Sequence, residues 1–375
     1  MPLVGGYMME PVKVGIVGSG FISGIYLENS KTFTSFDVVA CADLIIERAE
    51  GRAREYGVPK ACSTEELMDD PEIELVLNLT TPDGHYEVAK QAIEAGKSAY
   101  NEKPLSIDLA DGKKLVDLAR EAGVLIGGAP DTFLGGGIQT CRKLIDDGRI
   151  GEPIAVNSFL TNHGHESWHP DPGFFYKKGG GPMFDMGPYY LTALVNLIGP
   201  IRQVKASTRI TFPERTITSE PKHGEKITVD VPTHIVGIID FRNNATGSIL
   251  TSFDVWGAQL PRIEVYGTLG SLSVPDPNTF DGPVSIYLPE NKEWREVPLS
   301  HGYTSNSRGL GVADMANALR SKRPHRANGD LTYHVLEAMH AFHTASDTEK
   351  TVQLESTVEK PAPLPLGLIK GHVDP

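Results

Sequence analysis

The 375-residue sequence contains only three cysteines, and no apolar run approaches the roughly 20 residues that a membrane-spanning helix needs. Cys41, Cys62 and Cys141 are odd in number and far apart, which argues against a disulfide framework and fits a reducing compartment. The start of the chain, residues 1–11, lacks the basic region and long apolar stretch of a secretory signal. We therefore expect a cytoplasmic protein with no membrane segment.

Clusters of basic residues are also missing, and the formal net charge is −13. Nucleic-acid binding requires a basic surface that neutralises phosphates, so we expect no nucleic-acid partner. Hydrophobic residues make up 40% of the chain and charged residues 22%, which is typical of a globular protein. A chain of this length exceeds one ordinary core, and this predicts two domains.

The first third of the chain alternates strand and helix patterns. Short apolar runs predict strands at 12–17, 36–42, 73–79, 99–100 and 124–127. Periodic segments that end at glycine or in a turn predict helices at 47–56, 85–95 and 108–121. Such alternation predicts a parallel sheet with right-handed crossovers, in an α/β domain over residues 1–130.

Beyond residue 130 the pattern changes to long strands with few helices between them. Helices are predicted at 138–147, 183–198, 312–321 and 331–345, and strands at 234–241, 248–255 and 262–266. The first two of these strands are joined through Asn243-Asn244, which is typical of a hairpin turn. Residues 131–375 are therefore predicted to form an α+β domain with a large, mostly antiparallel sheet, followed by an extended tail.

The turn Gly18-Ser19-Gly20-Phe21-Ile22-Ser23 follows the first strand and opens a helix. The first glycine permits a tight turn, and the second lets the backbone approach a pyrophosphate at the helix N-terminus. Asp43 ends the second strand at the spacing expected for a carboxylate that binds the adenosine ribose. This carboxylate would repel a 2′-phosphate, which favours NAD over NADP. The alternative is a glycine turn that serves only strand-to-helix packing.

Glu102-Lys103-Pro104 ends another strand, at the carboxyl edge where parallel sheets bind ligands. Near a nicotinamide, burial and the cofactor's positive charge both disfavour the ammonium form of Lys103. A lysine tuned in this way can exchange a proton with a substrate hydroxyl. The alternative is a surface lysine before a turn proline.

A glycine loop at 179–181 leads into the segment that carries Asp185, Pro188 and Tyr189. Asp185 and Tyr189 are four residues apart and would share a helix face. Proline is tolerated only in a first helical turn, so Asp185 is expected at or near the helix start. The alternative is that Asp185 is an N-cap and Tyr189 a core aromatic.

The segment from 161 to 176 combines aromatic and polar side chains, as suits a sugar, whose C–H faces stack while its hydroxyls form hydrogen bonds. Its candidate substrate contacts are His163, His165, Trp168 and Tyr176. His334, near the start of a late helix, is a further candidate. His163, His165, Glu166 and His169 also resemble metal ligands, but they lack the helical spacing of a zinc hydrolase, and we expect no metal.

These motifs occur together and in order: the glycine turn with Asp43, the Thr81–His85 turn, Glu102-Lys103-Pro104 and the Asp185–Tyr189 segment. In this combination the chain resembles the glucose–fructose oxidoreductase / inositol dehydrogenase / rhizopine catabolism (Gfo/Idh/MocA) family. The resemblance implies a Rossmann domain, an open-faced sheet domain, NAD(P) use and homo-oligomers, dimers or tetramers, formed through the sheet. The cofactor contacts that it implies are Gly18, Gly20, Phe21, Ile22, Asp43, Thr81, Pro82, His85, Glu102 and Lys103.

By position, Lys103 matches the family's catalytic lysine and Asp185 its active-site aspartate. Many members carry histidine where this chain has Tyr189, so the proton acceptor is either Lys103 or Tyr189. A tyrosine with an ordinary pKa of about 10 needs a nearby lysine or a dry site to act near neutrality.

The expected function is oxidation of a hydroxyl of a sugar or cyclitol, with hydride transfer to NAD+ and substrate bound between the two domains. One alternative is redox-assisted glycoside cleavage, in which a tightly bound NAD is recycled. A second is a non-catalytic sugar or nucleotide sensor on the same fold, because one fold hosts many functions. The joint presence of Lys103, Asp185 and Tyr189 argues against the sensor.

Overall fold

A computed structural model describes residues 3–4, 7–8 and 10–375, and its contacts divide the chain into two compact units. Unit 1 contains the chain up to Gly136, then residues 300–333 and 361–375. Unit 2 contains residues 137–299 and 334–360. The sequence assigned all of 131–375 to one domain, whereas the contacts return two of its segments to unit 1.

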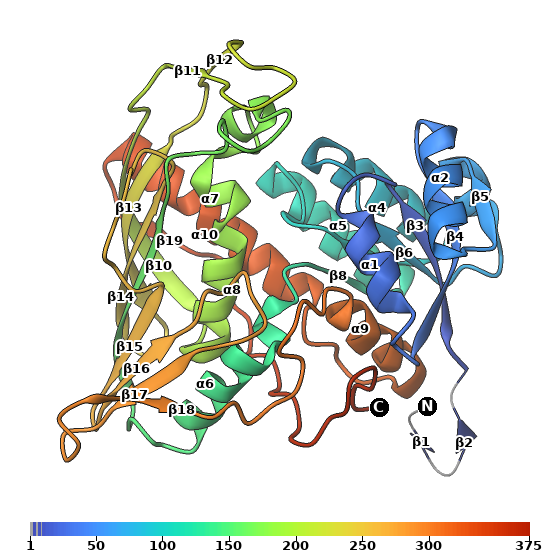
Figure 1. The fold of residues 1–375 in the computed structure, drawn as a ribbon. Helices are drawn as coiled ribbons and strands as arrows, with labels where there is room; N and C mark the ends of the chain where they lie inside the picture. Colours follow the sequence, from blue (N-terminus) through green and yellow to red (C-terminus); the bar gives the residue numbers. More distant parts are fainter. Residues whose placement is uncertain (1–2, 5–6, 9) are drawn as a thin grey trace. The chain divides into compact units, whose positions relative to one another are not determined.

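Unit 1 is built on a six-stranded sheet in which every neighbouring pair is parallel (Figure 1). Its strands, in spatial order, are β5 (Lys60–Cys62), β4 (Phe36–Ala42), β3 (Val12–Val17), β6 (Leu75–Asn78), β7 (Ser98–Asn101) and β8 (Ile126–Gly128). The helices along this part of the chain are α1 (Ser23–Ser30), α2 (Ile46–Tyr56), α3 (Thr64–Asp69), α4 (His85–Glu94) and α5 (Leu109–Ala122). The predicted parallel α/β architecture is confirmed, because the apolar runs form buried central strands.

The sequence analysis missed one helix of this unit, α3. The reason is its length, since six residues are too few to show a helical period. Its start nevertheless carries a local signal. Ser63 accepts a hydrogen bond from Glu66 N, and the Glu66 carboxylate accepts one from Ser63 N, which together form a capping box.

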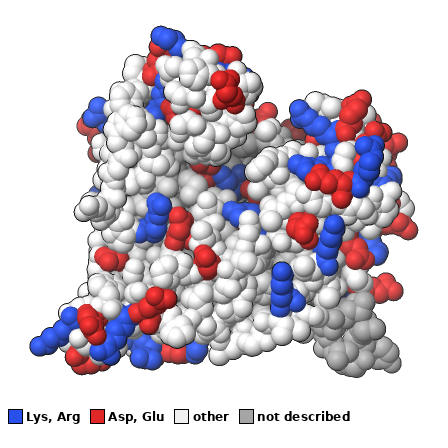
Figure 2. All heavy atoms as spheres, viewed as in Figure 1, with Lys and Arg blue, Asp and Glu red and all other residues white. Residues whose placement is uncertain are grey.

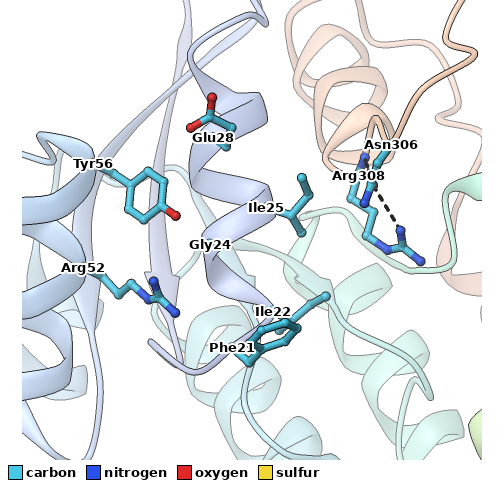
Figure 3. A pocket seen from close by; sticks show the side chains of 9 residues that line it. All are labelled: Phe21, Ile22, Gly24, Ile25, Glu28, Arg52, Tyr56, Asn306 and Arg308. Carbon is cyan, nitrogen blue, oxygen red and sulfur yellow. Dashed lines mark hydrogen bonds between the residues drawn. The ribbon is translucent and has the colours of Figure 1, made fainter. Parts of the chain in front are cut away.

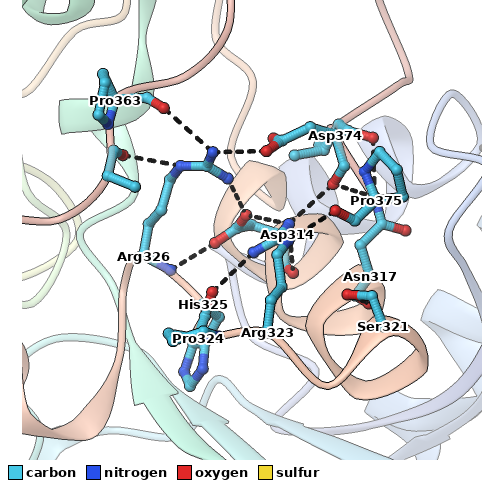
Figure 4. A network of polar contacts seen from close by, with 12 residues as sticks. Asp314, Asn317, Ser321, Arg323, Pro324, His325, Arg326, Pro363, Asp374 and Pro375 are labelled. Atoms are coloured by element: carbon cyan, nitrogen blue, oxygen red, sulfur yellow. Dashed lines mark hydrogen bonds and ion pairs between the residues drawn. The ribbon is translucent and has the colours of Figure 1, made fainter.

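Ionic contacts around the buried Asp314 join the two late segments of unit 1 to each other (Figure 4). Asp314 lies on α9 (Leu310–Ser321) and forms ion pairs with Arg323 and Arg326. Arg326 also pairs with Asp374 at 2.8 Å and donates to the carbonyls of Ala362 and Pro363. The tail is therefore extended, as expected, but it is fixed by hydrogen bonds and an ion pair to Arg326, 36 to 48 positions earlier.

Unit 2 contains a nine-stranded sheet that is antiparallel except for the β9–β14 pair. Its order is β18 (Trp294–Val297), β17 (Val284–Tyr287), β16 (Ser271–Val274), β15 (Ile263–Gly267), β9 (Pro153–Thr161), β14 (Thr246–Ser252), β13 (His234–Phe241), β10 (Ile201–Arg209) and β19 (Val352–Gln353). The predicted hairpin joins β13 and β14, with Asn244 at φ +69°.

Helices cover one face of this sheet. On α10 (Gly329–Thr348), Ser346 Oγ accepts a hydrogen bond from Thr208 N on β10, and Phe342 packs so closely on Gly237 that any larger side chain there would collide with its ring. On the other face Val236 is 43% exposed and Ile238 50%. The sheet is open-faced, as expected, and self-association through this face stays a prediction.

The remaining helices of unit 2 are α6 (Gly136–Asp146), α7 (Gly181–Asp185) and α8 (Gly187–Leu197). The single helix predicted over 183–198 is wrong, because the chain breaks at Met186 between α7 and α8. Pro188 lies in the first turn of α8, as the sequence required. A separate hairpin joins β11 (Glu214–Thr216) and β12 (Lys226–Thr228), and β1 (Leu3–Val4) pairs with β2 (Tyr7–Met8). Short 3-10 helices occupy η1 (Pro82–Gly84), η2 (Thr132–Leu134) and η3 (Gly173–Tyr176).

Among the described residues, no helix combines the length and apolar character that crossing a membrane requires. All three cysteines are buried free thiols. On the face drawn in Figure 2, lysine and arginine side chains lie intermixed with aspartate and glutamate.

Candidate functional site

The glycine turn after β3 has the backbone that its sequence predicts. Gly18 has φ +99°, and a Cβ there would lie 2.6 Å from the carbonyl carbon of Leu79, so only glycine fits. A Cβ built on Gly20 meets no atom within 4 Å, which leaves open space beside the turn. Ser23, at the third position of the motif, is buried and its Oγ donates to Gly20 O at 2.7 Å. The serine therefore closes the turn from within.

Asp43 lies at the end of β4, beside this turn. Its Oδ2 accepts a hydrogen bond from Ser19 N at 2.8 Å, and its Oδ1 accepts one from Ile45 N at 2.9 Å. A carboxylate has about four lone-pair sites, so acceptor positions remain beyond these two bonds. The contacts fix the carboxylate at the glycine turn, and the residues present fit a dinucleotide whose ribose hydroxyls donate to Asp43.

A cavity of about 550 Å³ lies along α1 next to the turn (Figure 3). Phe21, which is 96% exposed, lines it together with Ile22 and Ile25. The guanidinium of Arg52 also lines it and donates to Gly20 O at 3.1 Å. Asn306 and Arg308 of the late segment complete the lining. Sequence reasoning missed these last two, because about 280 residues separate them from the turn and no local motif marks them.

Asp131 fixes the late segment that carries Asn306 and Arg308. Its Oδ2 accepts hydrogen bonds from Gly309 N at 2.8 Å and Gly311 N at 3.0 Å. Burial raises the pKa of Asp131 to about 6, and the two backbone donors oppose that rise. Asp131 therefore positions the backbone next to Arg308, one of the residues that line the cavity.

The residues after β7 are held by a buried carboxylate. Glu102 accepts a hydrogen bond from Tyr26 Oη at 2.9 Å and another from Lys103 N at 2.9 Å. Burial raises the pKa of Tyr26 well above its usual value, so this phenol keeps its proton and donates it to Glu102. Lys103 is half-buried, and the Lys103–Pro104 peptide bond is cis. The predicted placement of Lys103 at the carboxyl edge of the sheet agrees with the structure.

His85, a predicted cofactor contact, is buried at the start of α4. Its Nδ1 lies 2.6 Å from Pro104 O and its Nε2 3.1 Å from Thr80 O. Burial lowers its pKa, and we assign the proton of the neutral ring to Nδ1, which has the shorter contact. His85 thus joins the Lys103–Pro104 segment to the turn after β6, where Thr81 is exposed and Pro82 begins η1.

In unit 2, Asp185 and Tyr189 do not share a continuous helix. Asp185 is the last residue of α7 and lies two positions before Gly187, where α8 begins, so it is near a helix start as expected. The N-cap alternative is wrong, because Met186 is the N-cap of α8. Tyr189 lies in the first turn of α8 and is buried. Their relative placement is set by the break at Met186, whose carbonyl accepts from Tyr189 N at 3.0 Å.

The structure joins Asp185 to a residue from the candidate substrate segment. His165 Nε2 lies 3.2 Å from Asp185 Oδ2, and both side chains are largely buried. His165 Nδ1 is buried and has no hydrogen-bond partner in the described part of the chain. If Nε2 carries the proton shared with Asp185, Nδ1 presents a lone pair that a ligand hydroxyl can use.

Aromatic rings enclose His165. Phe175 lies 3.9 Å from it and Phe253 4.7 Å, measured between ring centroids, and Trp168 meets it edge-on at 5.2 Å. Tyr176 is fully buried, and its Oη accepts a hydrogen bond from His165 N at 3.3 Å. Of the four predicted substrate contacts in this segment, His165 and Trp168 therefore cluster near Asp185, while Tyr176 supports the backbone.

The other two candidates lie elsewhere in unit 2. His163 lines a different cavity and stacks on Trp256. His334 is fully buried, where it accepts from Ile201 N at 3.0 Å and contacts Ser356 Oγ at 2.7 Å. Burial lowers its pKa to about 4, and these bonds give it a structural role. Within the described ranges, no group of three His, Cys, Asp or Glu side chains is placed to bind a metal ion.

Two family models match the chain. Residues 12–128 match an oxidoreductase family with an NAD-binding Rossmann fold, and residues 138–273 match the GFO/IDH/MocA C-terminal domain. The first of these models confirms that the N-terminal part is an NAD-binding Rossmann domain.

Individual relatives agree with this assignment. The chain is 36% identical over 146 residues to the 1,5-anhydro-D-fructose reductase of Ensifer adhaerens, covering 39% of this chain and 44% of that protein. It is 32% identical over 150 residues to the inositol 2-dehydrogenase/D-chiro-inositol 3-dehydrogenase of Lactiplantibacillus plantarum, covering 39% and 43%. These matches thus span less than half of each relative. The solved structure of levoglucosan dehydrogenase in complex with NADH shares the fold, with a TM-score of 0.80, 22% identity, and coverage of 92% of this chain and all of that one.

Proposed function

Because the chain belongs to the Gfo/Idh/MocA family of oxidoreductases, we propose that it transfers hydride from a hydroxyl-bearing carbon of a sugar or cyclitol to NAD+. The observation that carries the proposal lies within unit 1. The glycine turn with Asp43 follows β3 and β4, and Lys103 follows β7, so all three stand at the carboxyl edge of one parallel sheet. That edge is where such sheets bind ligands.

NAD+, when bound, supplies the hydride acceptor. The chain's part is to bind and orient it. Asp43 accepts hydrogen bonds from the ribose hydroxyls, and the open backbone at Gly20 lets the pyrophosphate approach the N-terminus of α1. The same carboxylate disfavours a 2′-phosphate by like-charge repulsion, so NAD is preferred to NADP.

Lys103 Nζ is the proposed acceptor of the hydroxyl proton. Its backbone is fixed on one side by Glu102 and on the other by the His85–Pro104 contact, which limits its freedom before substrate binds. Tyr189 is the second candidate, because its phenol is buried in the first turn of α8. In either case a positioned base of this kind contributes roughly 10²- to 10⁴-fold to the rate.

Asp185 is proposed to orient the substrate hydroxyls together with His165. The hydrogen bond between them fixes the carboxylate, and the unpartnered Nδ1 of His165 adds one acceptor. Phe175 and Phe253 shield His165 from water, and the exposed Trp168 offers an apolar face to a carbon ring. Such a mixture suits a neutral polyol, and the relatives named above act on inositols and anhydrosugars by their names.

The test is NADH absorbance with purified protein, NAD+ and a panel of cyclitols, aldoses and anhydrosugars. Steady NADH accumulation with at least one compound is expected. Lys103→Met should then lower kcat at least a hundredfold, since the transferred proton loses its acceptor. The matched control is Lys113→Met, at an exposed lysine of α5 that pairs with Asp117, and it should leave kcat unchanged.

Absence of NADH formation across the panel would contradict the proposal. Full turnover by the Lys103→Met variant would instead move the proton-acceptor role to Tyr189. Tyr189→Phe distinguishes that case, because it removes the phenolic proton donor and acceptor while keeping the ring.

A further inference from the structure

A second cavity, of about 510 Å³, lies within unit 2 and is not used by the proposed reaction. It is lined by His163, Glu166, Phe212, Glu214, Arg215 and Trp256, with threonine and serine hydroxyls between them. Its size falls in the range of small-molecule sites. We propose that this cavity binds a neutral saccharide ring, independently of the catalytic residues.

An aromatic platform forms one wall. Trp256 is 82% exposed, yet its ring stacks on His163 with 3.3 Å between centroids and 17° between planes. Phe212 meets the same histidine edge-on at 6.0 Å. His163 therefore holds the indole on one face and leaves the other face open, which is how a protein presents an aromatic ring to the C–H face of a sugar.

The opposite chemistry comes from the buried Arg215. Its terminal nitrogens donate to Glu166, at 2.8 Å, to Asp254 and to the carbonyls of His163 and Phe253. Its Nε is buried and has no hydrogen-bond partner among the residues that the structure describes. A buried N–H without a partner is costly, so a rearrangement of the lining that let a ligand oxygen accept from it would gain binding energy.

The charge of the lining selects against anions. Arg215 pairs with two carboxylates, Glu166 and Asp254, which leaves one negative charge in excess, and Glu214 pairs with Lys226 at 2.6 Å. An anion would be repelled by this excess negative charge. Burial, followed by the charge of Arg215, lowers the pKa of His163, so a neutral imidazole also faces the ligand. Hydroxyl groups, which both donate and accept, satisfy all of these groups.

The experiment uses the three tryptophans of the chain, Trp168, Trp256 and Trp294. In the full-length double variant Trp168→Phe/Trp294→Phe, the tryptophan fluorescence comes from Trp256 alone. Titration with methyl β-D-glucopyranoside, methyl α-D-mannopyranoside and myo-inositol at millimolar concentrations should give a saturable change with at least one. Glucose 6-phosphate, which adds negative charge, should bind at least tenfold more weakly than the neutral ring.

Two further variants in the same background locate the ligand. His163→Ala, which removes the support of the indole, should weaken binding about tenfold, a change equivalent to roughly 1.4 kcal/mol. Lys103→Met should leave the titration unchanged, so that loss of turnover and loss of this site are separate results.

The proposal is overturned if no neutral saccharide changes the fluorescence, or if His163→Ala leaves the affinity unaltered in a folded protein. Sedimentation velocity, which measures self-association, provides a third check. If the protein associates as its concentration rises, and the Trp256 fluorescence changes with that association rather than with saccharide, a second copy of the chain covers the indole. The proposal is then overturned, and the cavity is part of an interface.

Discussion

Arg326 in unit 1 and Arg215 in unit 2 are both buried beside two carboxylates. Arg326 uses all of its nitrogens: Nε donates to Ala362 O, and the terminal nitrogens donate to Asp314, Pro363 O and Asp374. Arg215 uses only its terminal nitrogens, and its Nε has no hydrogen-bond partner in the described structure. The two guanidinium groups are therefore similar in burial and equal in charge, but only that of Arg326 has a hydrogen-bond partner for every nitrogen.

This difference separates two roles of a buried arginine. We call Arg326 a clamp, because it holds segments of the chain together, and Arg215 a wall, because it lines a cavity. Each guanidinium nitrogen of Arg326 donates to an acceptor of the protein, and the network ends at the C-terminal tail (Figure 4). Arg215 lines a cavity, and one of its buried donors has no hydrogen-bond partner among the described residues. Since native proteins satisfy nearly all buried polar groups, a donor left over beside a cavity indicates a place for a ligand or water.

The largest expected effect comes from breaking the closed network. Arg326→Ala should lower the free energy of unfolding by about 3–5 kcal/mol, because it leaves the buried Asp314 with Arg323 as its only arginine partner and releases the tail. Arg215→Ala should cost less, about 1–3 kcal/mol, because Glu166 lines the cavity and water that enters there can solvate its carboxylate. Urea denaturation followed by circular dichroism measures both.

The control for this pair is Arg295→Ala, at an exposed arginine on β18 that pairs with Glu293. A surface pair of this kind is worth little, so the variant should unfold close to the wild type. Equal losses for Arg326→Ala and Arg215→Ala would break the distinction between clamp and wall.

A second pair of buried groups extends the comparison to pH. Burial lowers the pKa of His325 in unit 1 and of His334 in unit 2 from 6.5 to about 4. A histidine with a depressed pKa contributes stability that is present above pH 6.5 and is lost as the pH falls toward 4. Each pH unit is worth about 1.4 kcal/mol, so His334→Gln should remove roughly 3 kcal/mol of this acid-induced loss.

His325→Gln should act in the same direction, which would show that both units carry an acid-sensitive core. His223→Gln serves as the control, because that histidine is exposed. Free energies of unfolding measured from pH 6.5 down to about 4 decide the matter. An unchanged pH dependence in His334→Gln would mean that the buried ring is not the group that titrates.

Local signals predicted unit 1 well and unit 2 less well. The glycine turn, Asp43 and Lys103 each follow a short buried strand, and parallel strands place such residues at one edge whatever the rest of the chain does. The break between Asp185 and Tyr189 was missed because the spacing of four and the position of Pro188 fit one helix as well as two. Only the packing of the chain shows which occurs.

Other features depend on residues that are far apart in sequence. The return of 300–333 to unit 1 rests on Asp131 and on the ion pair between Arg320 and Glu74, neither of which belongs to a motif. The cavity wall joins His163 to Trp256, 93 positions later, and neither residue marks the other. The position of His334 near a helix start predicts a substrate contact, but the side chain is buried and both ring nitrogens form hydrogen bonds within the protein. Sequence pattern thus predicted the elements, and tertiary contacts decided which side chains face a ligand.

Asp43 combines the two roles compared above. Its carboxylate accepts hydrogen bonds from two backbone N–H groups, as a structural group would, and it keeps acceptor sites for a ligand. Asp43→Ser should raise KM for NAD+ and lower KM for NADP+, moving the ratio of kcat/KM values by roughly 10- to 100-fold, because a like-charge repulsion of a few kcal/mol disappears. Initial rates with each cofactor measure this ratio. Asp37→Ser, at an exposed carboxylate on the same strand, should leave it unchanged. If Asp43→Ser lowers stability but leaves the ratio unaltered, Asp43 belongs with Arg326 as a clamp, and cofactor selection rests on other residues at the turn.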